Sequence, residues 1–158
     1  MKSKLKGVTL VETMLYIGLF SIIILMVLNF MMSTQESTLR NNRRGVVYKA
    51  SEFIIQHFGS SFDNAISISN TNSLFQNDQG VLELSFSDGA KQYSLADSTL
   101  YFDSVPISPP DISVNKFFLE PLYNGDPTIP VAVRISIEII SNEDSDIADT
   151  INILSTLR

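Results

Sequence analysis

The sequence predicts an α+β protein in which a long N-terminal helix, transmembrane in its first half and amphipathic in its second, packs on a C-terminal antiparallel β-sheet. Three features support this prediction. An uncharged run extends from Thr13 to Gln35, apolar residues then recur at helical spacing as far as Phe62, and the later segments alternate apolar with polar residues. The first pattern is typical of a membrane span, the second of an amphipathic helix and the third of half-buried strands.

The uncharged run is long enough to cross a membrane. Glu12 is followed by 23 residues without a charge, up to Glu36. At a rise of about 1.5 Å per residue such a helix reaches about 34 Å, whereas the hydrocarbon core of a bilayer is about 30 Å thick. A single transmembrane helix is therefore expected here.

The residues before the span are basic: Lys2, Lys4 and Lys6. Basic residues on this side predict that the N-terminus lies on the cytoplasmic side of the membrane and the rest of the chain outside. A cleaved secretory signal is the alternative, because it is also basic and then apolar. The run is long for a signal, however, and the stretch from Asn29 to Gln35 contains no small-x-small cleavage site. The segment is expected to stay as an anchor.

The helix is expected to continue beyond the membrane, from Leu10 to about Phe62, because no proline interrupts it after Ser33. Apolar residues in this half recur at spacings of three, four and seven. They form the stripe expected to be buried: Leu39, Val46, Ala50, Phe53, Ile54, Phe58 and Phe62. The apolar face of an amphipathic helix must be buried against another element, and the strands that follow are expected to bury it.

The remainder of the chain reads as strands separated by turns. The expected strands are 65–69, 81–86, 91–95, 99–102, 112–119, 131–139 and 150–157. Ser87-Asp88-Gly89 is a hairpin signal between two of them. Consecutive strands with short turns indicate one antiparallel sheet with an apolar face wrapped on the amphipathic half of the helix.

Composition excludes several classes of function. The chain has no cysteine, so disulfides, thiolate nucleophiles and cysteine metal sites are excluded. Beyond Gly7, eight Lys and Arg face seventeen Asp and Glu, a balance of −9 that argues against a basic nucleic-acid-binding surface. There is also no phosphate-binding loop, nucleophile elbow or dinucleotide fingerprint. The sequence therefore predicts no enzyme and no cofactor.

The titratable residues give no strong metal site. His57 is the single histidine and is expected to be an ordinary residue of the helix face rather than a zinc ligand or a triad member. Glu143, Asp144 and Asp146 share one loop and could offer oxygen ligands to calcium. Their spacing matches no EF-hand, so a solvated acidic turn is the expectation, and calcium binding stays as the alternative.

Two groups of helix residues are candidates for contacts between chains. Gly18 and Ser21 are small residues that would allow another helix to approach closely inside the membrane, although ordinary use of both residues in a span is equally expected. Arg40, Arg43 and Arg44 form a basic cluster beyond the span. A solvated helix face is expected for this cluster, with lipid headgroups or acidic residues of a neighbouring subunit as alternatives.

The start of the span carries a recognisable motif. Lys4 to Glu12 reads Lys-Leu-Lys-Gly-Val-Thr-Leu-Val-Glu. This run resembles the prepilin signal of type IV pilins and of the pseudopilins of type II secretion and DNA-uptake machines. That signal consists of a basic leader, a glycine, a hydrophobic residue and a Thr-Leu-(Ile/Val)-Glu run that opens the span. The helix-then-sheet order extends the resemblance over the whole chain.

The resemblance implies a processing step. A prepilin peptidase would cut between Gly7 and Val8 and methylate the new amine on Val8. Glu12 would then be the fifth mature residue, which is the acidic position of the family. A carboxylate at membrane depth costs about 2.5–3.5 kcal/mol and should have a partner. The amine of an adjacent subunit, or that of the same chain, is the expected partner, and a headgroup-level glutamate without a role is the alternative.

The implied organisation has three parts: a leader at 1–7, a transmembrane and filament-core helix at 8–32, and an extracytoplasmic pilin-like domain at 33–158. The resemblance implies a structural subunit of a type IV pilus or of a type II secretion or competence pseudopilus. Its partners would be the peptidase, other subunits, membrane lipid and the assembly platform. Major subunits usually have a proline near Asn29, and its absence here favours a minor subunit.

A second class of function stays open. A single-span anchored domain could display its sheet to a ligand and never polymerise. Even within the first class, the sequence does not choose among secretion, DNA uptake, adhesion and motility, because one fold serves many functions.

Overall fold

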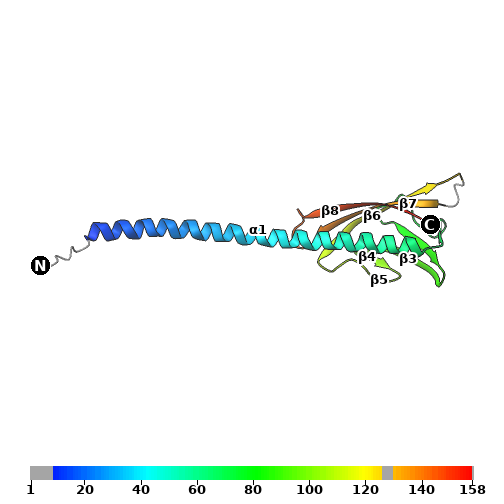
Figure 1. Ribbon diagram of the computed structural model, residues 1–158, viewed down its shortest axis with the longest axis horizontal. Helices are drawn as coiled ribbons and strands as arrows, with labels where there is room; N and C mark the ends of the chain where they lie inside the picture. Colours follow the sequence, from blue (N-terminus) through cyan, green and yellow to red (C-terminus); the bar gives the residue numbers. More distant parts are fainter. Residues whose placement is uncertain (1–8, 126–129, 158) are drawn as a thin grey trace. The chain divides into compact units, whose positions relative to one another are not determined.

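The structure, a computed structural model, describes residues 9–125 and 130–157 (Figure 1). One continuous helix, α1 (Leu10–Asn64, 55 residues), is followed by eight strands. The chain divides into two compact units, of which the first ends at Asn41 and the second begins at Asn42. The predicted helix, from Leu10 to about Phe62, is confirmed.

The first unit contains the apolar part of α1. All of its described residues are exposed, and by length and composition the helix is able to cross a membrane. Two of its hydroxyl groups are satisfied within the helix, because Ser21 and Thr34 donate to the carbonyls of Ile17 and Phe30, both at 2.8 Å. Such internal bonding is required where no water is available to the polar groups. This part of the helix therefore suits lipid.

In the second unit, α1 buries one face. The buried residues are Val47, Ala50, Ser51, Ile54, Phe58, Ser61 and Phe62. The prediction was correct for Ala50, Ile54, Phe58 and Phe62, and wrong for Leu39, Val46 and Phe53, whose side chains are 54%, 38% and 49% exposed. These three residues are seven apart, so they form a line of their own that runs beside the buried face. An apolar residue at the edge of a stripe fits the same spacing pattern as one at its centre.

The first sheet contains five antiparallel strands in the order β1-β2-β3-β4-β5. They are β1 (Ser67–Ile68), β2 (Val81–Phe86), β3 (Gly89–Ala96), β4 (Thr99–Phe102) and β5 (Val105–Pro106). The predicted hairpin is confirmed, because Phe86 pairs with Gly89 across the turn Ser87-Asp88. Two more hairpins with two-residue loops follow, between β3 and β4 and between β4 and β5.

The second sheet contains three antiparallel strands in the order β6-β7-β8. They are β6 (Ile112–Tyr123), β7 (Pro130–Ser141) and β8 (Ala148–Thr156). The central strand β7 carries a continuous row of buried residues, Val133, Ile135, Ile137 and Ile139. The register between β6 and β7 shifts twice, whereas that between β7 and β8 is unbroken.

The strands therefore form two sheets instead of the single sheet expected. Pro109 and Pro110 lie between β5 and β6, and β6 pairs with β7 instead of continuing the first sheet. Isolated backbone bonds join β6 to the segment that leads into β2: Phe117 N–H donates to Asp78 O at 2.7 Å, and Gly80 N–H donates to Phe117 O at 2.8 Å. Proline lacks the N–H group that a ladder needs, so the double proline favours a crossover at this point. The α+β fold class itself is confirmed.

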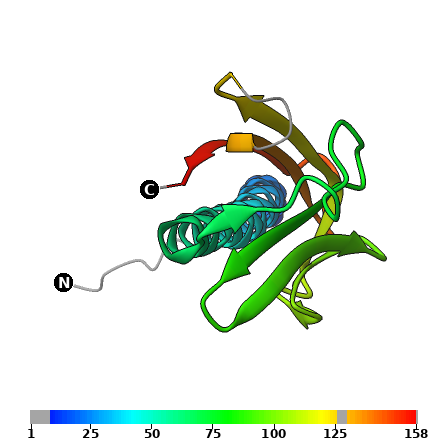
Figure 2. The same cartoon turned by 90° about the vertical axis from the view of Figure 1, so that its right-hand side faces the viewer.

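The core lies where the C-terminal part of α1 meets both sheets (Figure 2). Phe58 is fully buried at this junction. Its ring stacks on that of Tyr93 in β3, with centroids 4.1 Å apart, and lies 6.0 Å from that of Phe117 in β6. Burying one such side chain contributes about 1.5–3 kcal/mol. A single helix residue thus contacts both sheets.

Candidate functional site

The helix begins with a side-chain cap. The carbonyl oxygen of Thr9 accepts the N–H of Thr13 at 3.1 Å, and Thr9 Oγ1 accepts the N–H of Glu12 at 3.3 Å. Thr9 is therefore the N-cap, and Thr9-x-x-Glu12 has the spacing of a capping box. A carboxylate in the first turn also interacts favourably with the helix dipole. The residues that resemble the prepilin signal thus define the start of the helix.

The carboxylate of Glu12 has a partner on the same helix. Tyr16 Oη donates a hydrogen bond to Glu12 Oε1 at 3.3 Å, and both side chains are exposed. An amine was the expected partner of this carboxylate, and that expectation stays a prediction. The contact with Tyr16 is an additional one, which the spacing of four residues on a helix permits. Gly7 and Val8 lie outside the described residues, so the predicted cleavage point has no structural account.

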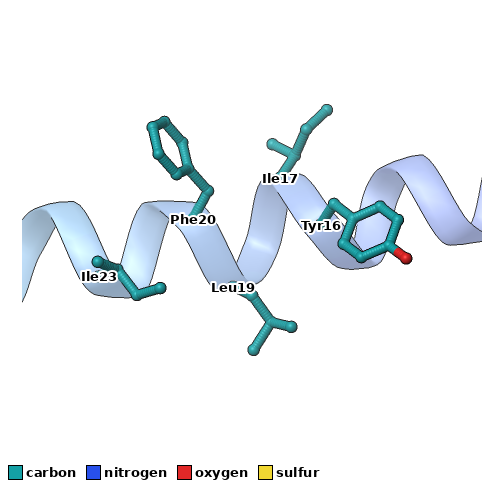
Figure 3. A pocket seen from close by; sticks show the side chains of 5 residues that line it. All are labelled: Tyr16, Ile17, Leu19, Phe20 and Ile23. Atoms are coloured by element: carbon teal, nitrogen blue, oxygen red, sulfur yellow. The ribbon is translucent and has the colours of Figure 1, made fainter.

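The first unit has a wide apolar surface without cover. Tyr16, Ile17, Leu19, Phe20 and Ile23 line a shallow hollow on one helix, and their side chains stand out from it (Figure 3). Their exposed fractions lie between 52% and 66%. Contiguous apolar surface of this extent is rare on a protein that faces only water. Lipid or other helices are the environments that suit it.

The two small residues of the span are open to another helix. A Cβ built on Gly18 would meet no atom within 4 Å among the described residues. Ser21 is exposed, and its hydroxyl is already bonded to Ile17 O, so no partner is needed to satisfy it. Both positions would therefore permit close approach of a second helix, as helix packing inside a membrane requires.

The basic cluster contacts the acidic loop of the same chain. Arg43 Nε donates a hydrogen bond to Glu143 Oε2 at 2.7 Å, which joins α1 to the loop between β7 and β8. About two turns of helix further on, Ser51 Oγ donates to Asp149 Oδ2 at 2.6 Å. The contact between these opposite charges from distant segments was not predicted, although both side chains keep contact with solvent, being 32% and 67% exposed. Among the described residues, no three His, Asp or Glu side chains are grouped to hold a metal ion.

His57 is partly buried and belongs to a hydrogen-bonded chain of side chains. Its Nδ1 lies 2.7 Å from the hydroxyl of Tyr93, which donates to Ser61 Oγ at 2.6 Å. The imidazole also meets the ring of Phe102 edge-on, with centroids 4.9 Å apart. Burial lowers the pKa of His57, and burial raises the pKa of Tyr93 well above its ordinary value. Both groups are therefore neutral near pH 7 and tie the helix to β3, as expected of a helix-face histidine.

Comparison of the chain with protein-family models, with curated protein sequences and with solved structures gives no match. The features that bear on function are therefore those of the chain itself: the helix start, the exposed apolar span and the sheets that cover one face of the second half of α1.

Proposed function

We propose that the chain is a minor structural subunit of a type IV pilus or of a type II secretion or competence pseudopilus. The observation that carries the proposal is the change of surface along one unbroken helix. Residues 9–41 are exposed and mainly apolar, whereas from Val47 onwards one face is buried. This helix begins with the capped Thr9-x-x-Glu12 directly after Gly7-Val8. An anchor and the spine of a folded domain are thus parts of a single element.

Processing would convert a membrane precursor into an assembly-competent subunit. A prepilin peptidase would cleave between Gly7 and Val8 and methylate the Val8 amine. The cut removes the three lysines that precede the span. The anchor would remain in the cytoplasmic membrane, crossing it once, with residues 33–158 outside.

Assembly would exchange lipid for other subunits around the apolar helix. The hollow lined by Tyr16 and Phe20, with Gly18 and Ser21, offers close contact to the same segment of a neighbour. The carboxylate of Glu12 would pair with the Val8 amine of that neighbour, while Tyr16 holds it beforehand. Such a pair specifies register more reliably than it adds stability.

The first test is mass spectrometry of the mature N-terminus in the native host. A chain that begins with N-methylated Val8 is expected. A chain that retains Met1, or one cut after Met32, would overturn the proposal. An unprocessed, membrane-inserted and monomeric chain would instead support the alternative of a non-polymerising anchored binding domain.

The second test separates the charge of Glu12 from its role at the helix start. Glu12→Leu is expected to insert normally into the membrane but to be absent from isolated filaments. Tyr16→Phe is the matched control: it removes the hydrogen bond and keeps the carboxylate, so incorporation should persist. The helix start should survive in both, because Thr9 Oγ1 bonds the backbone N–H of Glu12. Filament incorporation of Glu12→Leu at the wild-type level would remove this residue from the mechanism.

A further inference from the structure

Strand β8 forms the free edge of the three-stranded sheet. It has nine residues and pairs only with β7, in an unbroken register from Ala132↔Thr156 to Ile140↔Ala148. The edge is visible in Figure 2, where β8, coloured orange to red, borders the sheet. An edge strand presents unpaired N–H and C=O groups that are able to pair with another chain.

The direction of those groups follows from one hydrogen bond. Leu157 N–H donates to Val131 O at 3.2 Å. In an antiparallel pair, residues that bond their neighbour alternate with residues that do not. The groups that point away from β7 therefore belong to the even-numbered residues of β8: Ala148, Thr150, Asn152, Leu154 and Thr156. No hydrogen bond joins these groups to any other residue in the described ranges.

The other edges are protected. β1 and β5 have two residues each, and β5 contains Pro106. β6 carries two register shifts, and its backbone already bonds to the segment around Asp78 and Gly80. Within the described part of the chain, β8 is thus the one long edge without a cover.

β8 also lacks the usual devices against pairing. It contains no Lys, Arg or Pro and no bulge. Its single charge, Asp149, points to the inner face, where it accepts the Ser51 hydroxyl. Natural proteins usually block long edges with charge, proline or a bulge. A long edge left open is therefore unusual unless it is used.

The side chains of β8 indicate which sequence pattern an added strand would need. On the outer face every second residue is exposed and uncharged, with Leu154 60% exposed. On the inner face Ile153, and Leu157 just after the strand, are only partly buried and pack at the margin of the core. An added strand would cover this margin if apolar and uncharged polar residues alternated along it.

We propose that β8 is the docking site for an extended segment of a different protein, which adds as a fourth strand antiparallel to β8. Main-chain hydrogen bonds to the outward groups of Thr150, Asn152 and Leu154 would supply affinity. Apolar side chains against Ile153 and Leu157 would set the register. This is the strand-addition mode of peptide recognition, in which pockets for alternate side chains give specificity.

A second copy of this chain does not fit the edge. Antiparallel pairing of β8 with β8 requires a two-fold axis, which would set the helical segments 42–64 of the two copies antiparallel. Copies anchored in one membrane leave it in the same direction. A copy in the same orientation would have to offer a different open edge, and the described strands provide none. The choice of occupant rests on the membrane anchoring that is part of the proposed function, but not on filament assembly.

The test uses the full chain in lipid nanodiscs and a synthetic probe, an acetylated and amidated peptide that copies residues 148–156. Paired antiparallel about Asn152, the even-numbered residues of the peptide face β8. Two N-methylated versions of the peptide distinguish its edge that faces β8 from its opposite edge. The first is methylated at the positions equal to 150, 152 and 154, which face β8. The second is methylated at those equal to 151 and 153, which face away. Hydrogen exchange of the β8 amides, followed by NMR, reports binding.

Protection of the Thr150, Asn152 and Leu154 amides is expected with the second peptide and not with the first. The absence of protection at millimolar peptide, or equal binding of both versions, would overturn the proposal. Dimerisation of the chain in nanodiscs that Asn152→Pro abolishes would identify a second copy as the occupant and would also overturn it.

Two variants assign the binding to the edge. Asn152→Pro removes one outward N–H and leaves the ladder with β7, so peptide affinity should fall about tenfold or more. Ser136→Lys is the control, because Ser136 lies opposite Asn152 on β7 but away from the edge. Its affinity should stay within about twofold of wild type, as for ordinary surface substitutions. Equal affinities in both variants would contradict the edge as the binding site.

Discussion

Arg43 and Glu143, one hundred positions apart, meet at 2.7 Å between α1 and the loop that joins β7 to β8. The contact fastens the start of the buried half of the helix to the second sheet. The side chains are 32% and 67% exposed, so solvent screens their attraction. An ion pair in this setting contributes about 0.2–1 kcal/mol.

The first prediction concerns this pair. Arg43→Ala and Glu143→Ala should each lower the free energy of unfolding by about 1 kcal/mol or less, with a coupling energy of about 0.2–1 kcal/mol in the double-mutant cycle. The coupling should shrink at about 1 M salt, because exposed charges are screened there. Urea unfolding in low and high salt measures both effects. A coupling that salt leaves unchanged would show that the pair acts as a buried one.

The second prediction concerns the hairpins on either side of β4. Asp97, Ser98, Asp103 and Ser104 all have positive φ, between 48° and 68°. Two central residues with positive φ define the mirror-image turn of tight hairpins, in which glycine is favoured at the second position. A residue with a Cβ atom is destabilised by about 1–2 kcal/mol in the left-handed conformation, whereas glycine is not. Ser98→Gly and Ser104→Gly should therefore each raise the free energy of unfolding by about 0.5–1 kcal/mol.

Thermal unfolding measures the gain. Ser98→Ala serves as the control because it keeps the Cβ and removes only the hydroxyl. It should show no gain. Stabilisation by alanine equal to that by glycine would attribute the effect to the hydroxyl instead of to the backbone.

The third prediction contrasts two glycines. A Cβ on Gly80 would lie 2.7 Å from Phe117 O and 2.9 Å from Leu119 Cδ1, whereas one on Gly45 would meet nothing within 4 Å. Gly80→Ala should therefore destabilise the protein by about 1–3 kcal/mol through overpacking where the segment crosses β6. Gly45→Ala lies within α1 and should stabilise it by about 1 kcal/mol. Chemical unfolding of both variants gives the two signs. Tolerance of Gly80→Ala would mean that the crossing segment is free to shift away from β6.

The fourth prediction concerns pH. Burial lowers the pKa of His57 below its ordinary value of 6.5, so the unfolded chain binds this proton more readily than the folded one. The contribution of His57 to stability is therefore fully present above about pH 6.5 and is lost as the pH falls below that value. His57→Gln keeps a polar partner for Tyr93 and should flatten this part of the profile. Urea unfolding at several pH values between about 5 and 8 compares the two proteins. Parallel profiles would show that other groups carry the dependence.

Local patterns were sufficient for most of the elements. Proline-free helical spacing predicted α1 from Leu10 to within two residues of its end at Asn64, and the expected strands 81–86 and 99–102 coincide with β2 and β4. Alternation over Val133 to Ile139 identified the central strand of the second sheet. The two-residue strand β5 was missed, because Val105 and Pro106 carry no alternation.

Contacts between distant segments escaped prediction. The spacing of Val46 and Phe53 matched a buried stripe, but which of two adjacent lines of the helix is covered depends on where the sheets lie. The pairing of Arg43 with Glu143 was likewise hidden, since the two clusters carry no signal of proximity. The hydrogen-bonded chain from His57 to Ser61 needs Tyr93 from another element, so the single histidine gave no indication of its partner.

By itself, the sequence determined the extent of the helix, its uncharged first half, the motif at its start and the existence of the strands. These properties depend on interactions within a few residues, which composition and spacing report directly. The tertiary structure alone decided the division into two sheets, the helix face that is buried, the partner of the basic cluster and the edge at β8 that stays open. Each of these depends on contacts between segments that are distant in the sequence. Which surface is buried against which is therefore decided only when all the elements pack together.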